Sequence, residues 1–419
     1  MPHGIAVLIS GPDITQVEGL CGVVKSSDHY CISMKHAAFA IASFAVLGSC
    51  AYGSRGARAL TLKAAYANAF RIGSAINPEI VSGRDSLSQR IVIQQLNTIT
   101  AENVMKAATL NPRPGVFDYA EADAFVALGL QHNMFIVGHT LVWHNSTPSW
   151  FLQSADGKAN PRATVVENLR QYIEAVGTHF KGRVHAWDVV NEVVAEDGSY
   201  RPTTWVNAIG NGDSLVKLSF RFARQYAPGT ELYYNEFNAE RPTKRDGIVR
   251  LVRMLKKEGI RIDGVGIQAH WGLNYPRTDY IEAAIDSFAA LGVKVMITEL
   301  DVDVLPLTRE GQIIGQSFSE PQFQLEEFKK YLDPFPSALP DSVQQVLARR
   351  YAELFEIFYR KRDKIDRVTF WGVHDGMSWK NGYPIPNRTN YPLLFDRNRQ
   401  PKPAFAAVLG VPGRLGNSK

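Results

Sequence analysis

From about residue 60 onward, short apolar runs rich in β-branched and aromatic residues alternate with longer stretches of helical period. The runs that we expect to be strands cover residues 70–77, 95–100, 135–144, 184–191, 232–235, 264–270, 294–299 and 368–375. The helical stretches between them include residues 119–132, 163–179, 215–225, 244–257, 281–291 and 342–360. Alternating strands and helices build a parallel sheet, and eight such units predict a single closed (β/α)8 barrel of the TIM type, an α/β fold.

Polar residues recur at the carboxyl ends of the expected strands. In a (β/α)8 barrel these ends and the loops that follow them meet at one face, where the active site is built. The longest irregular piece, residues 305–340, is rich in proline and predicts a long loop with one short helix beside the cleft. A loop of this length is often functional, but its sequence does not assign it a role.

The start of the chain differs from the rest. The three cysteines, Cys21, Cys31 and Cys50, all precede residue 60, so we expect no disulfide in the barrel. From Met34 the chain has a short basic segment and then an apolar run over residues 37–47, which is typical of an export signal and too short for a transmembrane helix. Residues 1–33 lack helical or strand periodicity, and translation is predicted to start at Met34.

These patterns predict four segments. They are an extension over residues 1–33, a signal peptide or lipoprotein leader over 34–59, the catalytic barrel over 60–412 and a tail over 413–419. The cleavage point stays open, because residues 47–50 resemble a lipoprotein box that ends at Cys50, whereas residues 57–59 resemble an ordinary signal-peptidase site. Both routes predict a periplasmic, extracellular or outer-membrane location in a bacterium.

Composition and charge narrow the class of protein. Hydrophobic residues make up 45% of the chain and charged residues 21%, as in globular proteins with a large core. A mean hydropathy of -0.15 excludes a polytopic membrane protein. The net charge of +5 is small for this length and no long basic run occurs, so we expect no nucleic-acid partner. We expect membrane contact only through a lipid anchor at Cys50, and a monomeric protein.

Two glutamates carry the candidate chemistry. Glu192 closes the run 185–192, and Glu299 lies in the run 295–302, so they follow the fourth and seventh expected strands. Taken singly, a carboxylate after a strand is usually a helix cap or an ion-pair partner. A pair of carboxyl groups about 5 Å apart across a bound sugar is what retaining hydrolysis of a glycosidic bond requires. Two strand ends on opposing sides of a barrel mouth can supply that arrangement.

Both stretches closely resemble the acid/base and nucleophile segments of the family 10 glycoside hydrolases, which are mainly endo-β-1,4-xylanases. The resemblance covers roughly residues 60–412, with about seven motifs in the family's order. It implies that Glu192 is the acid/base and Glu299 the nucleophile, an assignment that the residues alone do not make. It also implies that His270 bonds the nucleophile and that Asn191 contacts the 2-hydroxyl of the sugar. The activity implied is retaining hydrolysis of internal β-1,4-xylosidic bonds of xylan.

The same resemblance implies the substrate-binding residues. They are Glu102, Asn103, Lys106, His139, Trp143, Asn235, Gln268, Trp371 and Trp379. Trp371 and Trp379 are expected to wall the pocket around the reacting sugar. The sequence departs from the family pattern at Ala107, where the family usually has Trp, and at Glu236 and Phe237, where it has Asp and Tyr.

Other functions fit parts of the sequence. A β-1,4-glucanase of the same fold would use the same two glutamates, and a catalytically silent glycan-binding lipoprotein could retain the cleft. Residues 264–269 fit the G-x-G-x-x-A dinucleotide pattern, but they lie within an expected strand and do not open a helix. We therefore expect neither a cofactor nor a metal, and we expect xylan and xylo-oligosaccharides as the partners.

Overall fold

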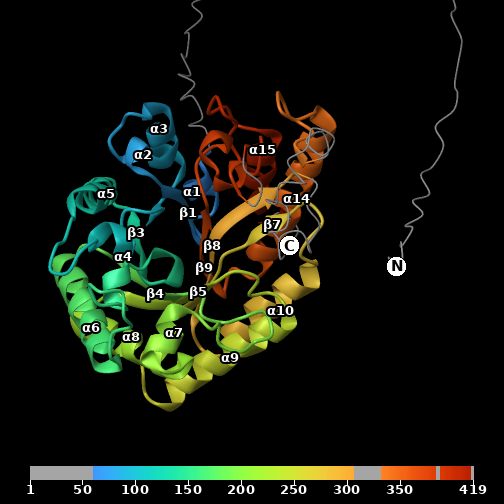
Figure 1. Ribbon diagram of the computed structural model, residues 1–419. Coiled ribbons are helices and arrows are strands. Elements are labelled where there is room, and N and C mark those ends of the chain that lie inside the picture. The colour runs from blue at the N-terminus through green and yellow to red at the C-terminus, as the bar shows by residue number, and fades with distance from the viewer. Residues whose placement is uncertain (1–59, 306–331, 384–386, 417–419) are drawn as a thin grey trace, which may run out of the picture. The chain divides into compact units, whose positions relative to one another are not determined.

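The computed structural model describes residues 60–305, 332–383 and 387–416 (Figure 1). The predicted extension and leader, residues 1–59, lie outside this range, and so does most of the predicted 305–340 loop. The described residues belong to one compact unit that begins at Arg58. Among the helices of the described ranges, none is both long enough and apolar enough to cross a membrane.

The described residues form nine strands, all paired in parallel. They are β1 (Arg71–Ile76), β2 (Thr98–Ala101), β3 (Phe135–Val142), β4 (Ala186–Asn191), β5 (Glu231–Glu236), β6 (Gly264–Ile267), β7 (His270–Gly272), β8 (Lys294–Asp303) and β9 (Ile365–Phe370). Strands β1 to β6 are neighbours in chain order, β1 also pairs with β9, and β9 pairs with β8. The additional β6–β8 pairing closes eight strands into a barrel, as predicted.

Helices surround this barrel. The longer ones are α3 (Ser86–Gln95), α5 (Ala120–Gln131), α6 (Arg162–His179), α8 (Gly212–Tyr226), α9 (Pro242–Lys257), α10 (Thr278–Ala289) and α14 (Asp341–Arg360). The shorter ones are α1 (Leu62–Ala65), α2 (Pro78–Val81), α4 (Ala107–Leu110), α7 (Thr204–Ile209), α15 (Pro403–Leu409) and α16 (Val411–Gly416). Short 3-10 helices are η1 (His144–Ser146), η2 (Ser149–Phe151), η4 (Asp375–Met377) and η5 (Trp379–Asn381). Figure 1 shows the labelled strands at the centre and α5, α6, α8, α9, α10 and α14 around them.

The outer helices form because apolar side chains recur at helical spacing along one face. In α6 the buried positions include Val165, Leu169, Ile173 and Val176, which lie three or four residues apart. Nearly all residues of β4 and β8 are buried, because side chains on one face of each strand pack against the helices and those on the other face fill the barrel interior. The predicted helical stretches and strands are therefore confirmed, apart from the boundaries discussed next.

Several strand boundaries differ from the prediction. The last strand, β9, covers Ile365–Phe370 rather than residues 368–375, and β3 ends at Val142 rather than at residue 144. The run 264–270 divides into β6 and β7 at Gln268 and Ala269, and Ala269 has a left-handed backbone with φ of 67°. Strand β8 continues beyond Glu299 to Asp303, because β7 pairs with its outer half and His270 lies opposite Asp301. The prediction that the seventh strand ends at Glu299 was wrong. Glu299 instead lies in the middle of a long strand.

The glycines of the 264–269 pattern serve packing inside the barrel. A Cβ atom on Gly266 would lie 2.3 Å from Oδ1 of Asn235 and 2.7 Å from a methyl carbon of Thr298. Glycine is thus required at this position for Asn235 to occupy the barrel interior. The pattern begins on β6 and does not open a helix.

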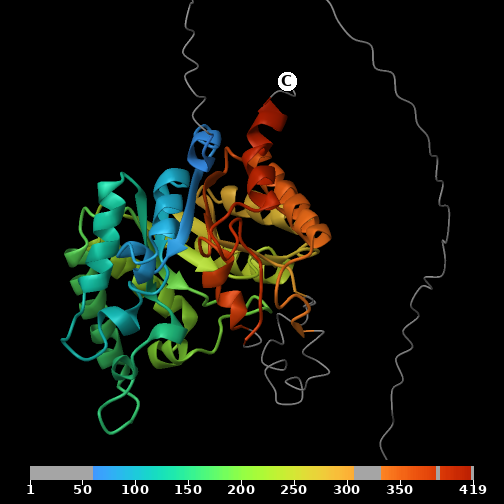
Figure 2. The same ribbon diagram turned by 90° about the horizontal axis from the view of Figure 1, so that it is seen from above.

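The two ends of the described domain meet beside α14. The hydroxyl of Tyr66, which follows α1, donates to the carbonyl oxygen of Val408 in α15 at 2.8 Å. The Tyr66 ring also packs against Phe355 of α14, with 5.5 Å between the ring centroids. Helix α15 packs along α14, and Figure 2 shows the two in red and orange. These contacts tie the ends of the barrel domain together.

Candidate active site

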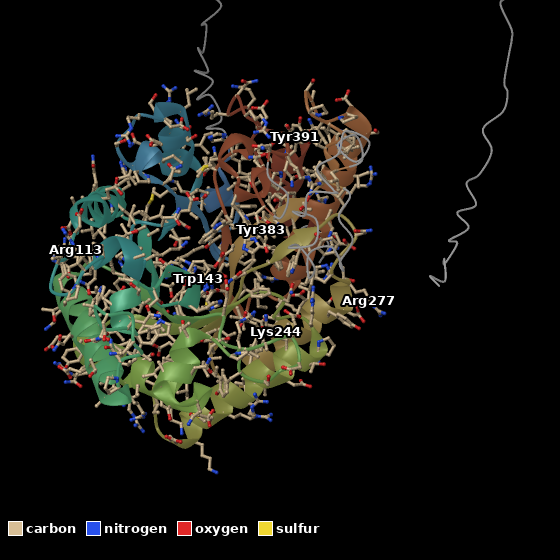
Figure 3. All side chains as sticks on the ribbon, in the orientation of Figure 1. Arg113, Trp143, Lys244, Arg277, Tyr383 and Tyr391 are labelled. Atoms are coloured by element: carbon tan, nitrogen blue, oxygen red, sulfur yellow. The ribbon has the colours of Figure 1, made fainter. Side chains whose placement is uncertain are left out.

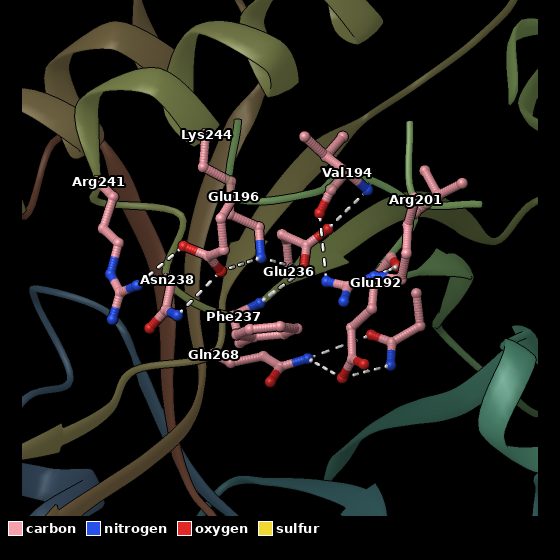
Figure 4. A network of polar contacts seen from close by, with 12 residues as sticks. Glu192, Val194, Glu196, Arg201, Glu236, Phe237, Asn238, Arg241, Lys244 and Gln268 are labelled. Carbon is pink, nitrogen blue, oxygen red and sulfur yellow. Dashed lines mark hydrogen bonds and ion pairs between the residues drawn. The ribbon is translucent and has the colours of Figure 1, made fainter. Parts of the chain in front are cut away.

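Glu192 lies one residue beyond the end of β4. Its carboxyl group accepts three hydrogen bonds from other predicted site residues. The indole nitrogen of Trp143 donates to Oε2 at 2.9 Å, while the amides of Gln268 and Asn191 donate to Oε1 at 2.9 Å and 3.2 Å. Figure 4 shows Glu192 and Gln268 in this arrangement. Trp143 lies near the middle of the ring of helices in Figure 3. The acid/base candidate is therefore held by residues from three elements.

Glu299 lies within β8 and is 5% exposed. Nδ2 of Asn235 donates to its Oε1 at 2.7 Å, and Nε2 of His270 lies 3.1 Å from its Oε2. The hydroxyl of Thr298 donates to Oδ1 of Asn235 at 2.6 Å, which fixes the orientation of that amide. Glu299 thus faces two hydrogen-bond donors.

His270 supplies a positive charge beside Glu299. Its Nδ1 atom lies 3.0 Å from Oδ2 of Asp301, so both ring nitrogens face carboxylates. Burial lowers the pKa of His270, but the carboxylates of Asp301 and Glu299 outweigh it and raise the pKa to about 9. His270 is consequently an imidazolium at neutral pH and donates to both carboxylates.

The two glutamates are linked through amides. Nδ2 of Asn235, which contacts Glu299, also lies 2.9 Å from Oδ1 of Asn191. Asn191 in turn donates to Glu192. The structure therefore brings together Glu192, Glu299, Asn191, Asn235, Gln268 and His270, which the sequence placed on four different strand segments.

The residues that follow β2 lie at the same mouth. Nζ of Lys106 donates to Oδ1 of Asn103 at 2.8 Å and lies 4.8 Å from the centroid of the Trp143 ring. Burial lowers the pKa of Lys106, and the charges of Glu299 and Glu102 oppose that shift. Burial also raises the pKa of Glu102, and Lys106 opposes it.

The remaining predicted aromatic residues surround the two glutamates. The ring of His139 lies 5.3 Å from that of Trp371 in an edge-on arrangement, and its Nδ1 lies 2.9 Å from Oδ2 of the buried Asp188. The Trp379 ring lies 4.8 Å from that of His270. Aromatic faces of this kind offer apolar area to the C–H bonds of a pyranose ring.

Open space adjoins this group. A cavity of about 380 Å³ lies next to His270 and is lined by Trp271 of β7 and by Asn238, Arg241 and Tyr275 from the segments after β5 and β7. Of the predicted site residues, only His270 lines this cavity, and its ring contacts Glu299.

Comparison with known proteins agrees with this geometry. Residues 61–411 match the family model described as Glycosyl hydrolase family 10. The chain belongs to glycosyl hydrolase family 10. This confirms the family that the motifs predicted and identifies the protein as a glycoside hydrolase.

Individual members of family 10 are similar along nearly their whole length. Endo-1,4-beta-xylanase A of Xylanibacter ruminicola is 37% identical over 351 residues, which cover 83% of this chain and 92% of that protein. The solved structure of a GH10 endoxylanase from a sugarcane soil metagenome is 38% identical, with a TM-score of 0.77, over 84% of this chain and 99% of that chain. A mutant structure in complex with xylotriose is 32% identical, with a TM-score of 0.73, over 84% and 99%.

Several residues of this family 10 site were not singled out from the sequence. Asp301 contacts both His270 and Trp379. Its Oδ2 atom accepts a hydrogen bond from the indole nitrogen of Trp379 at 2.8 Å. The signal was present, because Asp301 lies two residues after Glu299 and side chains two apart on a strand share a face. Asp188, which bonds His139, lies within β4 with no comparable signal.

The departures from the family 10 pattern occupy different surroundings. Ala107 is 6% exposed and begins α4, so the position is filled by packing. Glu236 is completely buried at the end of β5, and Phe237 packs beside the ammonium of Lys244, which lies 3.4 Å from the ring centroid. These two residues of the β5 segment lie behind the acid/base turn.

Proposed function

We propose that this protein is an exported endo-1,4-β-xylanase that hydrolyses internal β-1,4-xylosidic bonds of xylan with retention of configuration. The observation that carries the proposal is the pair Glu192 and Glu299, presented at one barrel mouth and joined through the amides of Asn191 and Asn235. Retaining glycosidases use two carboxyl groups in this way. Xylan and xylo-oligosaccharides are the proposed substrates, since similar proteins are xylanases and one related structure holds xylotriose.

In the first step, a carboxylate oxygen of Glu299 attacks the anomeric carbon of the sugar. The bond to the glycosidic oxygen breaks, and Glu192 transfers its proton to that oxygen, so the leaving chain departs as an alcohol. The charge of His270 and the Asn235 amide hold the attacking carboxylate in place. The product is a glycosyl ester of Glu299.

In the second step, Glu192 acts as a base. It takes a proton from a water molecule, whose oxygen attacks the anomeric carbon and displaces the carboxylate of Glu299. Two inversions at the same carbon give net retention. The proton returns to Glu192, so both residues regain their starting states.

The walls of the cleft support the choice of xylose. Trp371 and Trp379 lie on the His270 side of the two carboxyl groups. A tight aromatic wall near C5 of the sugar admits xylose and rejects the hydroxymethyl group of glucose. We therefore expect faster cleavage of xylan than of carboxymethylcellulose. A higher rate on carboxymethylcellulose would assign the protein as a β-1,4-glucanase instead.

Proton NMR during digestion of linear xylan tests the mechanism. The full chain should release short oligosaccharides whose new reducing ends are first β-anomers. Early α-anomers would still indicate a glycosidase, but they would contradict the assignment of Glu299 as the nucleophile. Binding without any product would assign a silent glycan-binding protein, against which the presence of both glutamates and of His270 argues.

Export is a separate part of the proposal and rests on the leader pattern of residues 34–59. We propose that the mature protein acts outside the cytoplasm as a monomer, with or without a lipid on Cys50. Intact-mass measurement of the mature protein separates the two routes. A mass that includes a diacylglyceryl group indicates a lipoprotein, whereas cleavage near residue 59 indicates an ordinary signal peptide.

A further inference from the structure

A buried ion pair lies behind the acid/base residue. Glu236, the last residue of β5, and Lys244, in the first turns of α9, are both completely buried, with 3.0 Å between Oε1 and Nζ. Figure 4 shows the pair with Phe237 beside it. Replacing a buried ion pair by apolar residues is often neutral or stabilising, so stability alone is a weak reason for its presence. Its contacts give a better reason.

The carboxylate of Glu236 receives four donors. Lys244 and the backbone N–H of Phe237 contact Oε1, the latter at 3.2 Å. The hydroxyl of Tyr234 and the backbone N–H of Val194 contact Oε2, the latter at 3.1 Å. All four neighbours of the Glu236 carboxyl group donate hydrogen bonds to it. A proton on this carboxyl group would find no acceptor, so the arrangement fits the ionised form.

One of these donors belongs to the turn that carries Glu192. Glu192 has a φ of 60°, a left-handed conformation that few residues with a Cβ adopt without support from their surroundings. The N–H groups of Val193 and Val194 both donate to the Tyr234 hydroxyl at 3.2 Å. Since that hydroxyl accepts these bonds, its own hydrogen is free to donate to Glu236.

The carbonyl side of the same turn is held by Arg201. Its Nε donates to the carbonyl oxygen of Glu192 at 3.1 Å, and a terminal nitrogen donates to that of Val194 at 3.3 Å. The guanidinium carbon of Arg201 also lies 5.1 Å from the centroid of the Phe237 ring, and Lys244 contacts the same ring. The strained turn is thus held by β5 on its N–H side and by Arg201 on its carbonyl side.

We infer that Glu236, with Lys244 as its counter-ion, is a positioning residue that holds the Glu192 turn where its carboxyl group meets the leaving oxygen. Glu236 is completely buried and acts through Val194 and Tyr234. The inference rests on the proposed function, in which Glu192 is the acid/base.

A positioning role and a merely structural role predict different kinetics. If the turn shifts, proton transfer to the leaving oxygen suffers, whereas attack by Glu299 does not. A substrate with a poor leaving group, such as xylotriose, needs that proton, but an activated aryl glycoside such as dinitrophenyl β-xylobioside does not. The ratio of the two kcat/KM values therefore reports on the acid alone. Because both values scale with the amount of folded enzyme, the ratio is independent of how much of a variant folds.

Two variants test the inference. Glu236→Gln places an amide donor among four donors, and Tyr234→Phe removes only the hydroxyl that bridges the turn to Glu236. We expect each to lower kcat/KM for xylotriose by roughly tenfold or more and that for dinitrophenyl β-xylobioside by less than about threefold. Glu236→Asp keeps the charge and should restore part of the lost ratio.

Asp375→Asn is the matched control. Asp375 is a completely buried carboxylate with Lys402 at 2.9 Å, and it accepts from the backbone N–H of Leu393 rather than from the Glu192 turn. This variant should change both kcat/KM values by the same factor.

The outcomes separate the inference from the proposed function. A ratio that stays at the wild-type value in Glu236→Gln and Tyr234→Phe overturns the positioning role, whatever the loss in activity. If only Tyr234→Phe gives active protein, its ratio decides alone. A wild-type chain that cleaves neither substrate contradicts the proposed function itself.

Discussion

The two glutamates of the site lie on backbone of different kinds. Glu299 lies inside β8, where its backbone N–H donates to the carbonyl oxygen of Gln268 at 2.8 Å. Glu192 lies outside its strand, in a turn with a left-handed backbone that Arg201 and Tyr234 hold with their side chains. The backbone N–H of Glu192 also donates to a neighbouring segment, to the carbonyl oxygen of Asn235 at 3.0 Å, so the difference lies in the turn that follows, which side chains hold.

This difference fits the two proposed roles. A nucleophile has a single task, and a strand positions a side chain more precisely than a loop does. An acid/base residue must exchange a proton first with the leaving oxygen and then with water, which requires a place at the mouth. Its position consequently depends on residues that touch no substrate. Substitutions around Glu192 and around Glu299 should therefore fail in different ways.

The largest effect is expected for Glu299→Ala. Without the nucleophile no glycosyl ester forms, so kcat/KM should fall by roughly four to six orders of magnitude on every substrate. The loss should be similar for xylotriose and for dinitrophenyl β-xylobioside. Calorimetry should still detect xylo-oligosaccharide binding, since the aromatic walls remain. Substantial turnover by this variant would place the nucleophile elsewhere.

A smaller and graded effect is expected for Glu192→Ala. The general acid contributes about 10²- to 10⁴-fold, so kcat/KM for xylotriose should fall by that order. The value for the activated aryl substrate should change far less, because its leaving group needs little protonation. Steady-state kinetics on both substrates check this. Equal losses of kcat/KM on the two substrates would contradict the acid/base role of Glu192.

Much of this site could be predicted because it follows the periodicity of the fold. Apolar runs separated by helical stretches predicted eight strands and a barrel, and polar residues at the strand ends predicted the mouth. Glu192, Glu299 and His270 were found in this way, together with the family resemblance. Asp301 was within reach of the same reasoning, since it shares a strand face with Glu299.

The support of the acid/base turn could not be predicted. Its hydrogen bonds join Val194 to Tyr234 and Glu236, which lie 40 and 42 residues away in sequence. Such pairs depend on how adjacent strands and helix α9 pack, and no local pattern encodes them. The break between β6 and β7 was missed for a similar reason, because Ala269 takes a left-handed backbone that its side chain does not suggest. The sequence showed Glu236 only as a departure from the family pattern.

The smallest expected effect concerns the nucleophile side and appears as a shift in pH dependence. Burial lowers the pKa of His270, and Asp301 and Glu299 raise it to about 9, above the ordinary value of 6.5. In the folded protein the charge of His270 is therefore present at neutral pH and is lost as the pH rises through 9. Asp301→Asn removes one of the two carboxylates that raise this pKa.

With Asp301→Asn, the alkaline limb of kcat/KM should move to lower pH. Dinitrophenyl β-xylobioside is the substrate to use, because its cleavage does not require a protonated Glu192 and the limb then reports on His270. The control is Asp366→Asn, which removes a carboxylate paired with Arg71 at 2.8 Å at the opposite end of the barrel and should leave the limb in place. The sign follows from linkage, since His270 binds its proton more tightly in the folded protein than in the unfolded chain. The free energy of unfolding should accordingly fall between pH 6.5 and 9 in the wild-type protein and less steeply in Asp301→Asn. An unmoved limb would mean that the charge beside Glu299 does not come from His270, and the nucleophile would then depend on its place in β8 alone.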